Sequence, residues 1–340
     1  MIYIVTHKGF FGQGLMPWEG VDVFNLYHNL TSYGLTLKMV ELSDLENIND
    51  ASLIITGSFQ QLEIKKVLED KLFYLMNQGC KILPNFDLVL AHENKGYQSL
   101  LKKKYKIDEL NEKYLTSDSL YFKSNYVYKD PNGAGSHGVI LPENSQALYK
   151  WSKKISFDSL RVEGVKKILK LVFKKFFLFG WRYSSLRVRY LKSPKGIVVQ
   201  ELIPELTFDY KVLIFGERFY VLKRHVRKGD FRASGSGNFE SVTNVEPQVL
   251  IACKLLKEKL STPYLSVDIG YDGNKAYIIE FQGPHFGPYT YLSSKCYFKL
   301  GHDGSVKSFL QEESETLEGI LARSIYQYIK DENESFSPCL

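Results

Sequence analysis

The residues of this chain that are best suited to chemistry lie in the stretch LSVDIGYDGNKAYIIEFQG, residues 265–283. Two apolar runs flank Asp272-Gly273-Asn274, a turn sequence that typically joins antiparallel strands. Asp268 lies in the first run, and Glu280 and Gln282 share one face of the second because strand side chains alternate. A connection of about five residues would place Asp268 opposite Glu280. Such oxygen ligands suit Mg²⁺ that bridges the phosphates of a nucleotide, whereas a solvent-facing strand with ordinary acids is the plain alternative.

A second candidate site is the glycine-rich stretch YVYKDPNGAGSHGVIL, residues 126–141. Lys129 lies on the strand expected at the start of this stretch, and a loop of small residues follows it. Small residues let backbone N–H groups approach a phosphate closely, and the lysine adds a positive charge. The pattern therefore favours a phosphate-binding loop over a generic glycine-rich hairpin.

Further lysine and arginine side chains occupy positions that are typical of anion-binding sites. Lys95 is expected in the first turn of a helix that begins near His92 or Glu93, and a lysine there opposes the helix dipole unless it shares a phosphate with that terminus. Arg224 and Arg232 bracket a Gly/Ser-rich loop, which indicates a grip on an anion.

The elements that must position these residues follow from hydrophobic periodicity. Residues 1–90 predict a small open α/β domain with a parallel sheet, because short apolar strands alternate with amphipathic helices. The expected strands are 2–5, 36–40, 53–56 and 81–83, and the expected helices are 21–33 and 61–77. Beyond them we expect an extended stretch from Pro84 to Ala91, a strand from Gly196, two strands around a turn at Gly216-Glu217, and helices at 246–260 and 317–328.

Length and composition predict a globular protein of two or three domains, since the chain has 340 residues. The net charge of +6 is too modest to imply nucleic acid. The four cysteines have neither metal-ligand nor redox-motif spacing and are expected to be reduced. Neither a secretion signal nor a bilayer-spanning run is present, so we expect the protein in the cytoplasm, free or peripheral at the inner membrane face.

Residues 150–195 are unusually basic, and between Val165 and Phe177 apolar residues interleave with lysines at roughly helical spacing. Such a segment could lie on an anionic membrane surface or hold a polyanionic acceptor. An amphipathic helix packed on a sheet, with a solvated basic face, is the simpler alternative.

In this order, the segments resemble the ATP-grasp superfamily, and the branch of ribosomal-protein glutamate ligases and glutathione synthetase is the most similar. The resemblance covers roughly residues 85–285. It implies an α/β (α+β) fold with an N-terminal open α/β domain (1–90) and two subdomains that clasp ATP. The first, 91–200, would carry the glycine lid loop and the basic insertion at about 150–195. The second, 201–340, would carry the Mg²⁺-binding hairpin.

The resemblance also implies roles for individual residues. The ATP-binding set is Lys95, Lys129, the lid residues Gly133, Gly135, Ser136 and Gly138, the adenine hinge at Glu201 and Ile203, Asp209 for the ribose, and Lys211. The catalytic set is Arg232, Lys129 and Arg224, with Arg232 at the γ-phosphate and the substrate carboxylate. The metal ligands are Asp268, Glu280 and Gln282, for Mg²⁺ with Mn²⁺ as a substitute.

The chain departs from the family pattern at several positions. Gln282 stands where this branch usually has asparagine, His137 stands in the lid loop where a smaller residue is common, and Ala233-Ser234 replaces the more usual Ser-Asn. The basic segment is longer than the usual connection between lid loop and hinge, which indicates an insertion that serves a particular partner.

The resemblance implies an ATP-dependent ligase that joins a carboxylate to an amine through an acyl phosphate. One substrate could be large, anionic or membrane-borne, such as a cell-surface glycan precursor that receives an amino acid, and residues 150–195 would then provide a peripheral membrane contact. A free amino acid or peptide is the plain alternative, nucleic acid is not expected, and a homodimer is plausible. The competing functions are an ATP-grasp kinase, which phosphorylates its acceptor without forming an amide, and a nucleotide-binding regulatory module.

Overall fold

The computed structural model describes residues 1–13, 20–107, 110–133, 138–158, 194–204, 206–227, 229–233, 235–312 and 314–335. The chain forms two compact units: residues 1–110 together with 203–340, and residues 111–202. Each unit has its own sheets and its own core, so each is described separately below.

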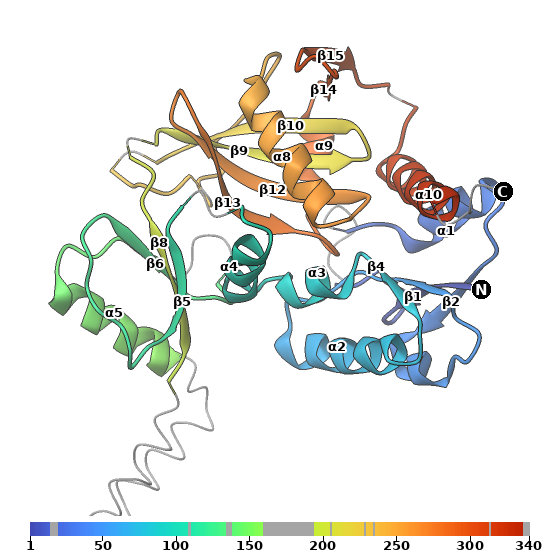
Figure 1. Ribbon diagram of the computed structural model, residues 1–340, viewed down its shortest axis with the longest axis horizontal. Coiled ribbons are helices and arrows are strands. Elements are labelled where there is room, and N and C mark those ends of the chain that lie inside the picture. Colours follow the sequence, from blue (N-terminus) through green and yellow to red (C-terminus); the bar gives the residue numbers. More distant parts are fainter. Residues whose placement is uncertain are drawn as a thin grey trace, which may run out of the picture. The chain divides into compact units, whose positions relative to one another are not determined.

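The first unit begins with an open sheet of four parallel strands (Figure 1). The strands are β1 (Ile2–Thr6), β2 (Leu37–Glu41), β3 (Leu53–Ile55) and β4 (Lys81–Leu83), in the order β2-β1-β3-β4. The connections include α1 (Val23–Ser32), the short 3-10 helix η2 (Leu42–Asn47) and α2 (Leu62–Met76). The apolar side of α2, with Leu68, Leu72 and Leu75, packs against this sheet. The predicted parallel α/β arrangement of this region is therefore confirmed.

The prediction of an extended stretch is wrong for residues 86–91, which form helix α3 (Phe86–Ala91). The side chain of Asn85 accepts a hydrogen bond from the N–H of Leu88, which begins the helix. Leu88 and Ala91, three residues apart, then share the same core. The next helix, α4 (Lys95–Lys104), begins later than expected because Asn94 caps it.

The second sheet of this unit has seven strands. They are β9 (Phe208–Phe215), β10 (Arg218–His225), β11 (Phe239–Ser241), β12 (Tyr264–Tyr271), β13 (Ala276–Gln282), β14 (Cys296–Leu300) and β15 (Val306–Leu310), in the order β13-β12-β9-β10-β14-β15, with β11 beside β10. The pairs are antiparallel, so side chains on each strand alternate between two faces. The β9–β10 pair and the β12–β13 hairpin were predicted, whereas β14 and β15 were not.

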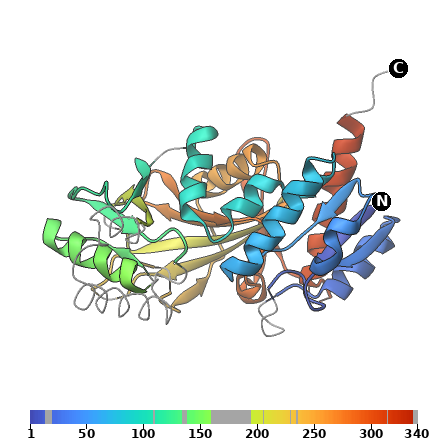
Figure 2. The ribbon, with the colours of Figure 1, turned by 90° about the horizontal axis from the view of Figure 1, so that it is seen from below.

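Helices cover both faces of this sheet. On one face, α8 (Pro247–Lys259) lies beside α3 and α4 (Figure 2). The three helices share a core with strand residues such as Val212 and Val267. On the other face, α1 and α10 (Leu317–Ser335) lie side by side (Figure 1). Residues such as Leu26 and Leu321 pack there against Leu213. The short helix α9 (Tyr289–Ser293) adds Tyr291 to this second core. Lys211, Arg224 and Asp268 alternate along their strands with residues of the first core and therefore lie on this second face, beyond the apolar cluster.

The second unit is a four-stranded antiparallel sheet with a helix against it. The strands are β5 (Glu112–Thr116), β6 (Tyr126–Lys129), β7 (Val139–Ile140) and β8 (Gly196–Glu201), in the order β5-β8-β6-β7, and the helix is α5 (Ser145–Asp158). Tyr128, Leu148 and Ile197 form the centre of its core. Most of the predicted basic insertion, residues 159–193, lies outside the described residues. Within the described part of the chain, no helix is long and apolar enough to cross a bilayer.

Candidate functional site

Strands β12 and β13 form the predicted acid-bearing hairpin, and Asp268 pairs with Glu280. The route to this register differs from the predicted one. Only four residues separate the two strands, and Asp272 holds the turn by accepting hydrogen bonds from the N–H groups of Asn274 and Lys275. A register shift directly after Asp268 then brings it opposite Glu280. The bulge, rather than a longer turn, therefore places the two carboxylates on one face.

Three cations hold these carboxylates. Lys211 on β9 donates to one oxygen of Asp268 at 2.8 Å, and Arg224 on β10 donates to the other oxygen at 2.8 Å. Lys95 lies 3.2 Å from Glu280. Burial alone would raise the pKa of Asp268, but the neighbouring Arg224 and Lys211 charges outweigh it and hold that pKa well below its ordinary value. Asp268 therefore stays ionised, which is the state that metal binding would require.

Arg224 is itself fixed by a second acid. Its Nε and Nη2 atoms donate to the two oxygens of Asp209 at 2.8 and 2.6 Å, and both side chains are almost fully buried. Bidentate pairs of this kind hold a guanidinium in one orientation. Asp209, expected to bind ribose, is thus engaged through both oxygens with Arg224, and its ribose role stays a prediction.

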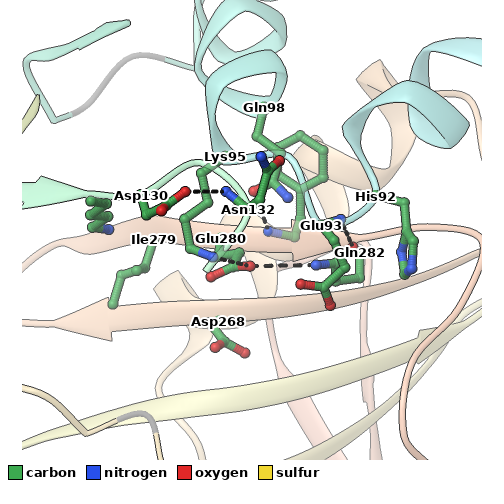
Figure 3. Close-up of polar contacts among 12 residues, drawn as sticks. His92, Glu93, Lys95, Gln98, Asp130, Asn132, Asp268, Ile279, Glu280 and Gln282 are labelled. Atoms are coloured by element: carbon green, nitrogen blue, oxygen red, sulfur yellow. Dashed lines mark hydrogen bonds and ion pairs between the residues drawn. The ribbon is translucent and has the colours of Figure 1, made fainter. Parts of the chain in front are cut away.

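The start of α4 carries Lys95 into the site. The side chain of Asn94 accepts a hydrogen bond from the N–H of Tyr97, and the N–H of Glu93 donates to the side-chain oxygen of Gln282 at 3.2 Å. Lys95, Glu93, Glu280 and Gln282 therefore lie together where α4 begins beside β13 (Figure 3). Burial of Lys95 would lower its pKa, but the nearby Glu280 and Glu93 charges raise it, so the ammonium stays charged.

Arg232 lies on the loop that follows β10. Its guanidinium donates to Asp230 through Nε at 2.9 Å and through Nη2 at 2.7 Å, and about a third of its side chain is exposed. The predicted γ-phosphate ligand thus already has an acidic partner two residues away. Ser234 of the same loop lies outside the described residues.

The second unit carries the other predicted phosphate lysine. Lys129 ends β6, is buried, and donates to the side-chain oxygen of Gln200 on β8 at 2.5 Å. The amide group of Gln200 in turn donates to Glu112 at 2.8 Å. Strand pairing and these side-chain bonds therefore set the direction of the lysine.

The two described ends of the lid loop are joined to Asp130, the residue after Lys129. Its N–H donates to the carbonyl of Gly138 at 2.7 Å, and its carbonyl accepts from the N–H of Gly133. Gly138 has φ +74°, and a Cβ there would meet the Asp130 side chain at 2.7 Å, so this position requires glycine. Gly135 and Ser136 lie outside the described residues, so their predicted roles are untested.

The predicted adenine hinge follows β8. The N–H of Glu201 donates to the carbonyl of Asn111 and the N–H of Leu202 to that of Asn125, both within the second unit. Ile203, the first residue of the returning chain in the other unit, is buried. The assignment of Glu201 and Ile203 to the adenine stays a prediction.

Comparison with known proteins bears on the fold. No family profile matches the chain, and no curated protein matches it by sequence. Among solved structures it is similar to D-alanine–D-alanine ligase from Bacillus anthracis, with 13% identity, a TM-score of 0.53 and coverage of 98% of this chain and 99% of that one.

Two further solved structures carry peptides. Macrocyclase MdnC bound with precursor peptide MdnA from Microcystis aeruginosa MRC has 8% identity, a TM-score of 0.52 and coverage of 96% and 99%. ATP-grasp ligase PsnB complexed with precursor peptide PsnA2 and AMPPNP has 9% identity, a TM-score of 0.51 and coverage of 96% of each chain. This chain has the ATP-grasp fold.

The ATP-grasp fold implies a divalent metal, and the donor set tests whether one fits. Within the described residues, His, Cys, Asp and Glu side chains do not form a group of three or more that could hold a metal alone. Mg²⁺, however, is usually held by one or two carboxylates together with phosphate oxygens. Asp268 and Glu280 face each other and supply two such carboxylates, whereas the side-chain oxygen of Gln282 already accepts from Glu93. The two acids therefore fit the metal, and the side-chain oxygen of Gln282 would be shared between the metal and the N–H of Glu93.

Several residues that hold the elements of the candidate site together were missed in the sequence. The side chain of Lys65 on α2 is buried and donates to the carbonyl of His92 at 2.5 Å. The Nζ atom of Lys102 donates to the carbonyl of Ile279, at the bulge, at 3.0 Å. Gln98 accepts from the N–H of Phe281 and so ties α4 to β13. For Lys65 and Lys102, the signal in the sequence was a lysine at an otherwise apolar position of a helix. Their backbone partners lie far away in the chain and could not be identified from it.

Proposed function

We propose that the protein is an ATP-dependent ligase that joins a carboxylate to an amine. One observation carries this proposal: two carboxylates face each other on a rigid hairpin, and three cations from other elements surround them. Costly buried charges of this kind cluster at functional sites, which favours an enzyme over a regulatory module that only keeps a nucleotide. The solved structures with the same fold include ligases, and structures of PsnB are complexed with AMPPNP and with Mg and ADP, which supports ATP and Mg²⁺ as the cofactors of this chain.

The reaction would take place in two steps. The substrate carboxylate attacks the γ-phosphate of ATP, which gives an acyl phosphate and ADP. The amine then attacks the acyl carbon, and phosphate leaves with the electrons of the acyl–oxygen bond. Activation is needed because an amine cannot expel oxide from a carboxylate, whereas phosphate is a good leaving group.

The residues of the chain would act mainly by placing charge. The Lys95 and Lys129 side chains would bind phosphate oxygens, and Arg232 would bind both the γ-phosphate and the substrate carboxylate, because two anions must meet there. Mg²⁺, or Mn²⁺ in its place, would be held by Asp268 and Glu280 and would neutralise phosphate charge. The lid from Gly133 to Gly138 would exclude water from the acyl phosphate.

The substrate class is a further part of the proposal. Two solved structures with this fold carry precursor peptides, which supports a peptide or an amino acid as one substrate. The basic segment 150–195 supports a second possibility, an anionic or membrane-borne acceptor such as a glycan precursor. Deletion of residues 160–190 from a chain that still folds, followed by liposome binding and activity assays, separates the two; unchanged results would rule out the anionic acceptor. Homodimerisation stays a prediction, to be measured by light scattering.

The experiment that tests the function measures phosphate release from ATP and Mg²⁺ with pools of carboxylates and amines. Products are then identified by mass spectrometry. A ligase requires both pools and yields a product lighter by one water than the sum of its substrates. A phosphorylated acceptor with no amine requirement would instead identify a kinase, and tight ATP binding without turnover would identify a binding module.

A further inference from the structure

In the first unit, every predicted phosphate-binding cation already has a carboxylate partner. The pairs are Lys95 with Glu280, Lys211 with Asp268, Arg224 with Asp209 and Asp268, and Arg232 with Asp230. Four cations thus face four carboxylates, so the charges of this set cancel. A nucleotide or a metal ion that arrives alone must therefore break an existing pair and leave one partner uncompensated.

Lys211 and Arg224 share Asp268, but they are held very differently. Arg224 makes three hydrogen bonds to two acids, and its side chain is 6% exposed. Among the described residues, Lys211 makes one ion pair, through a single oxygen of Asp268, and its side chain is 25% exposed. A single-point, partly solvated ammonium is the easier partner to displace, because it is compact and strongly hydrated and can turn to another anion.

We propose that Lys211 takes the place of the divalent metal on Asp268 in the nucleotide-free protein, so that metal and nucleotide bind there only together. This inference rests on the proposed function, since it assumes a metal and a nucleotide at the same site. Phosphate attracts Lys211 away from Asp268, and the metal takes the vacated carboxylate oxygen. Arg224, fixed by Asp209, stays in place and keeps Asp268 oriented throughout the exchange.

The exchange makes the two ligands energetically coupled. A metal ion alone would have to approach the Asp268 oxygen that the positive Lys211 ammonium already binds, and the two like charges would repel. A nucleotide alone would draw Lys211 away and leave Asp268 without one of its cations. When both bind, each charge again has a partner, so each ligand should raise the affinity of the other by the same factor.

This inference is tested, without requiring turnover, by measuring Mn²⁺ binding to the full chain with electron paramagnetic resonance. The wild-type protein should bind Mn²⁺ weakly alone and much more tightly with AMPPNP. Lys211→Met should raise the affinity for Mn²⁺ alone by about tenfold or more, since one opposing charge is lost. Lys211→Arg, which keeps the charge, should not raise the affinity for Mn²⁺ alone. Lys223→Met is the matched control, because it removes an equal charge from the neighbouring strand β10 without contact to Asp268.

Two outcomes would overturn the exchange: wild-type protein that binds Mn²⁺ equally well with and without AMPPNP, or a Lys211→Met variant whose Mn²⁺ affinity matches that of Lys223→Met. Thermal unfolding of each variant shows whether it is folded, and Lys211→Gln repeats the test with a polar side chain if the methionine variant is not. Absence of the proposed nucleotide site gives a different result, since AMPPNP would then not bind to the wild type even with Mn²⁺ present. Failure of the ligase reaction alone is seen in the product analysis described above and leaves the Mn²⁺ measurements unchanged.

Discussion

Arg224 shows how a single residue organises the site, since it binds Asp209 through two nitrogens and Asp268 through one of them. In the sequence, Arg224 and Asp209 could be assigned only separate contacts with the nucleotide. The structure indicates that Asp209 acts on the position of Arg224. The cost of removing either charge should then appear in stability as well as in activity.

Asp209→Asn should lower the free energy of unfolding by about 3 kcal/mol, because it removes one partner of a buried ion pair. Urea denaturation at neutral pH measures this change. Asp70→Asn is the control, since Asp70 pairs with Lys66 on an exposed surface and such pairs contribute little. Equal stability of the two variants would contradict the structural role of the Asp209–Arg224 pair.

Arg232→Ala should lower turnover by about 10²- to 10³-fold, the usual effect of removing one preorganised charge from a transition state. Nucleotide binding should change little, because several other cations contact the phosphates in the proposed site. Steady-state kinetics measure the turnover, and AMPPNP titration measures the nucleotide binding. Arg227→Ala removes an exposed arginine of the same loop and should leave both unchanged. Retained activity in Arg232→Ala would exclude the proposed role of this residue.

At the scale of elements, the N-terminus of α4 determines where Lys95 lies. Asn94→Ala removes the cap and should lower stability by about 1 kcal/mol. It should also reduce turnover, since Lys95 is the first residue of the helix. Asp22→Ala removes the cap of α1 at a similar cost, away from the site, and should not change turnover of the folded fraction. Thermal unfolding and kinetics on both variants make the comparison, and an Asn94→Ala variant with normal turnover would contradict a role for this cap in positioning Lys95.

The elements differ in how far the sequence could predict them. The hairpin with Asp268 and Glu280, the strand with Lys129 and the parallel N-terminal sheet were predicted, because turn residues and alternation are local signals. The bulge after Asp268 was not, since four connecting residues and five give similar local patterns. Helix α3 was missed because its cap at Asn85 and its few apolar residues fit an extended strand equally well.

The contacts of the site residues could not be predicted in the same way. Lys211 and Asp268 are paired across neighbouring strands, and Lys65 reaches a carbonyl on another element. Such partners are far apart in the chain, so they depend on packing that one sequence does not reveal. The resemblance to a family supplied candidate residues, and the structure supplied the partners that hold those on the described part of the chain.

At the scale of the molecule, one core joins the beginning and the end of the chain. Residues of α1, α10 and β9, such as Leu26, Leu321 and Leu213, pack together within the first unit. This core places the N-terminal sheet and the acid-bearing sheet in one compact unit, with residues 111–202 as the other. His92 and His285 are buried in the first unit, which gives it a specific sensitivity to acid.

Burial lowers the pKa of His285 from 6.5 to about 4 and that of His92 well below its ordinary value. The unfolded chain therefore binds more protons than the folded one between these values, so stability is full above pH 6.5 and is lost as the pH falls toward 4. His285 alone should cost about 2 kcal/mol between pH 7.5 and pH 5.

Urea denaturation at several pH values measures this loss. His285→Gln should flatten the pH dependence, whereas His28→Gln, at an exposed histidine of α1, should not. An unchanged slope in the His285→Gln variant would show that the acid sensitivity arises elsewhere.

Oxygen-18 in the carboxylate substrate tests the central claim, phosphorylation of a carboxylate, most directly. Pooled carboxylic acids labelled in both oxygens are incubated with the protein, ATP, Mg²⁺ and the amine pool, and the released phosphate is analysed by mass spectrometry. An acyl phosphate transfers one labelled oxygen to each phosphate and leaves one in the amide product. Release of unlabelled phosphate together with a product that keeps both labels would contradict the account.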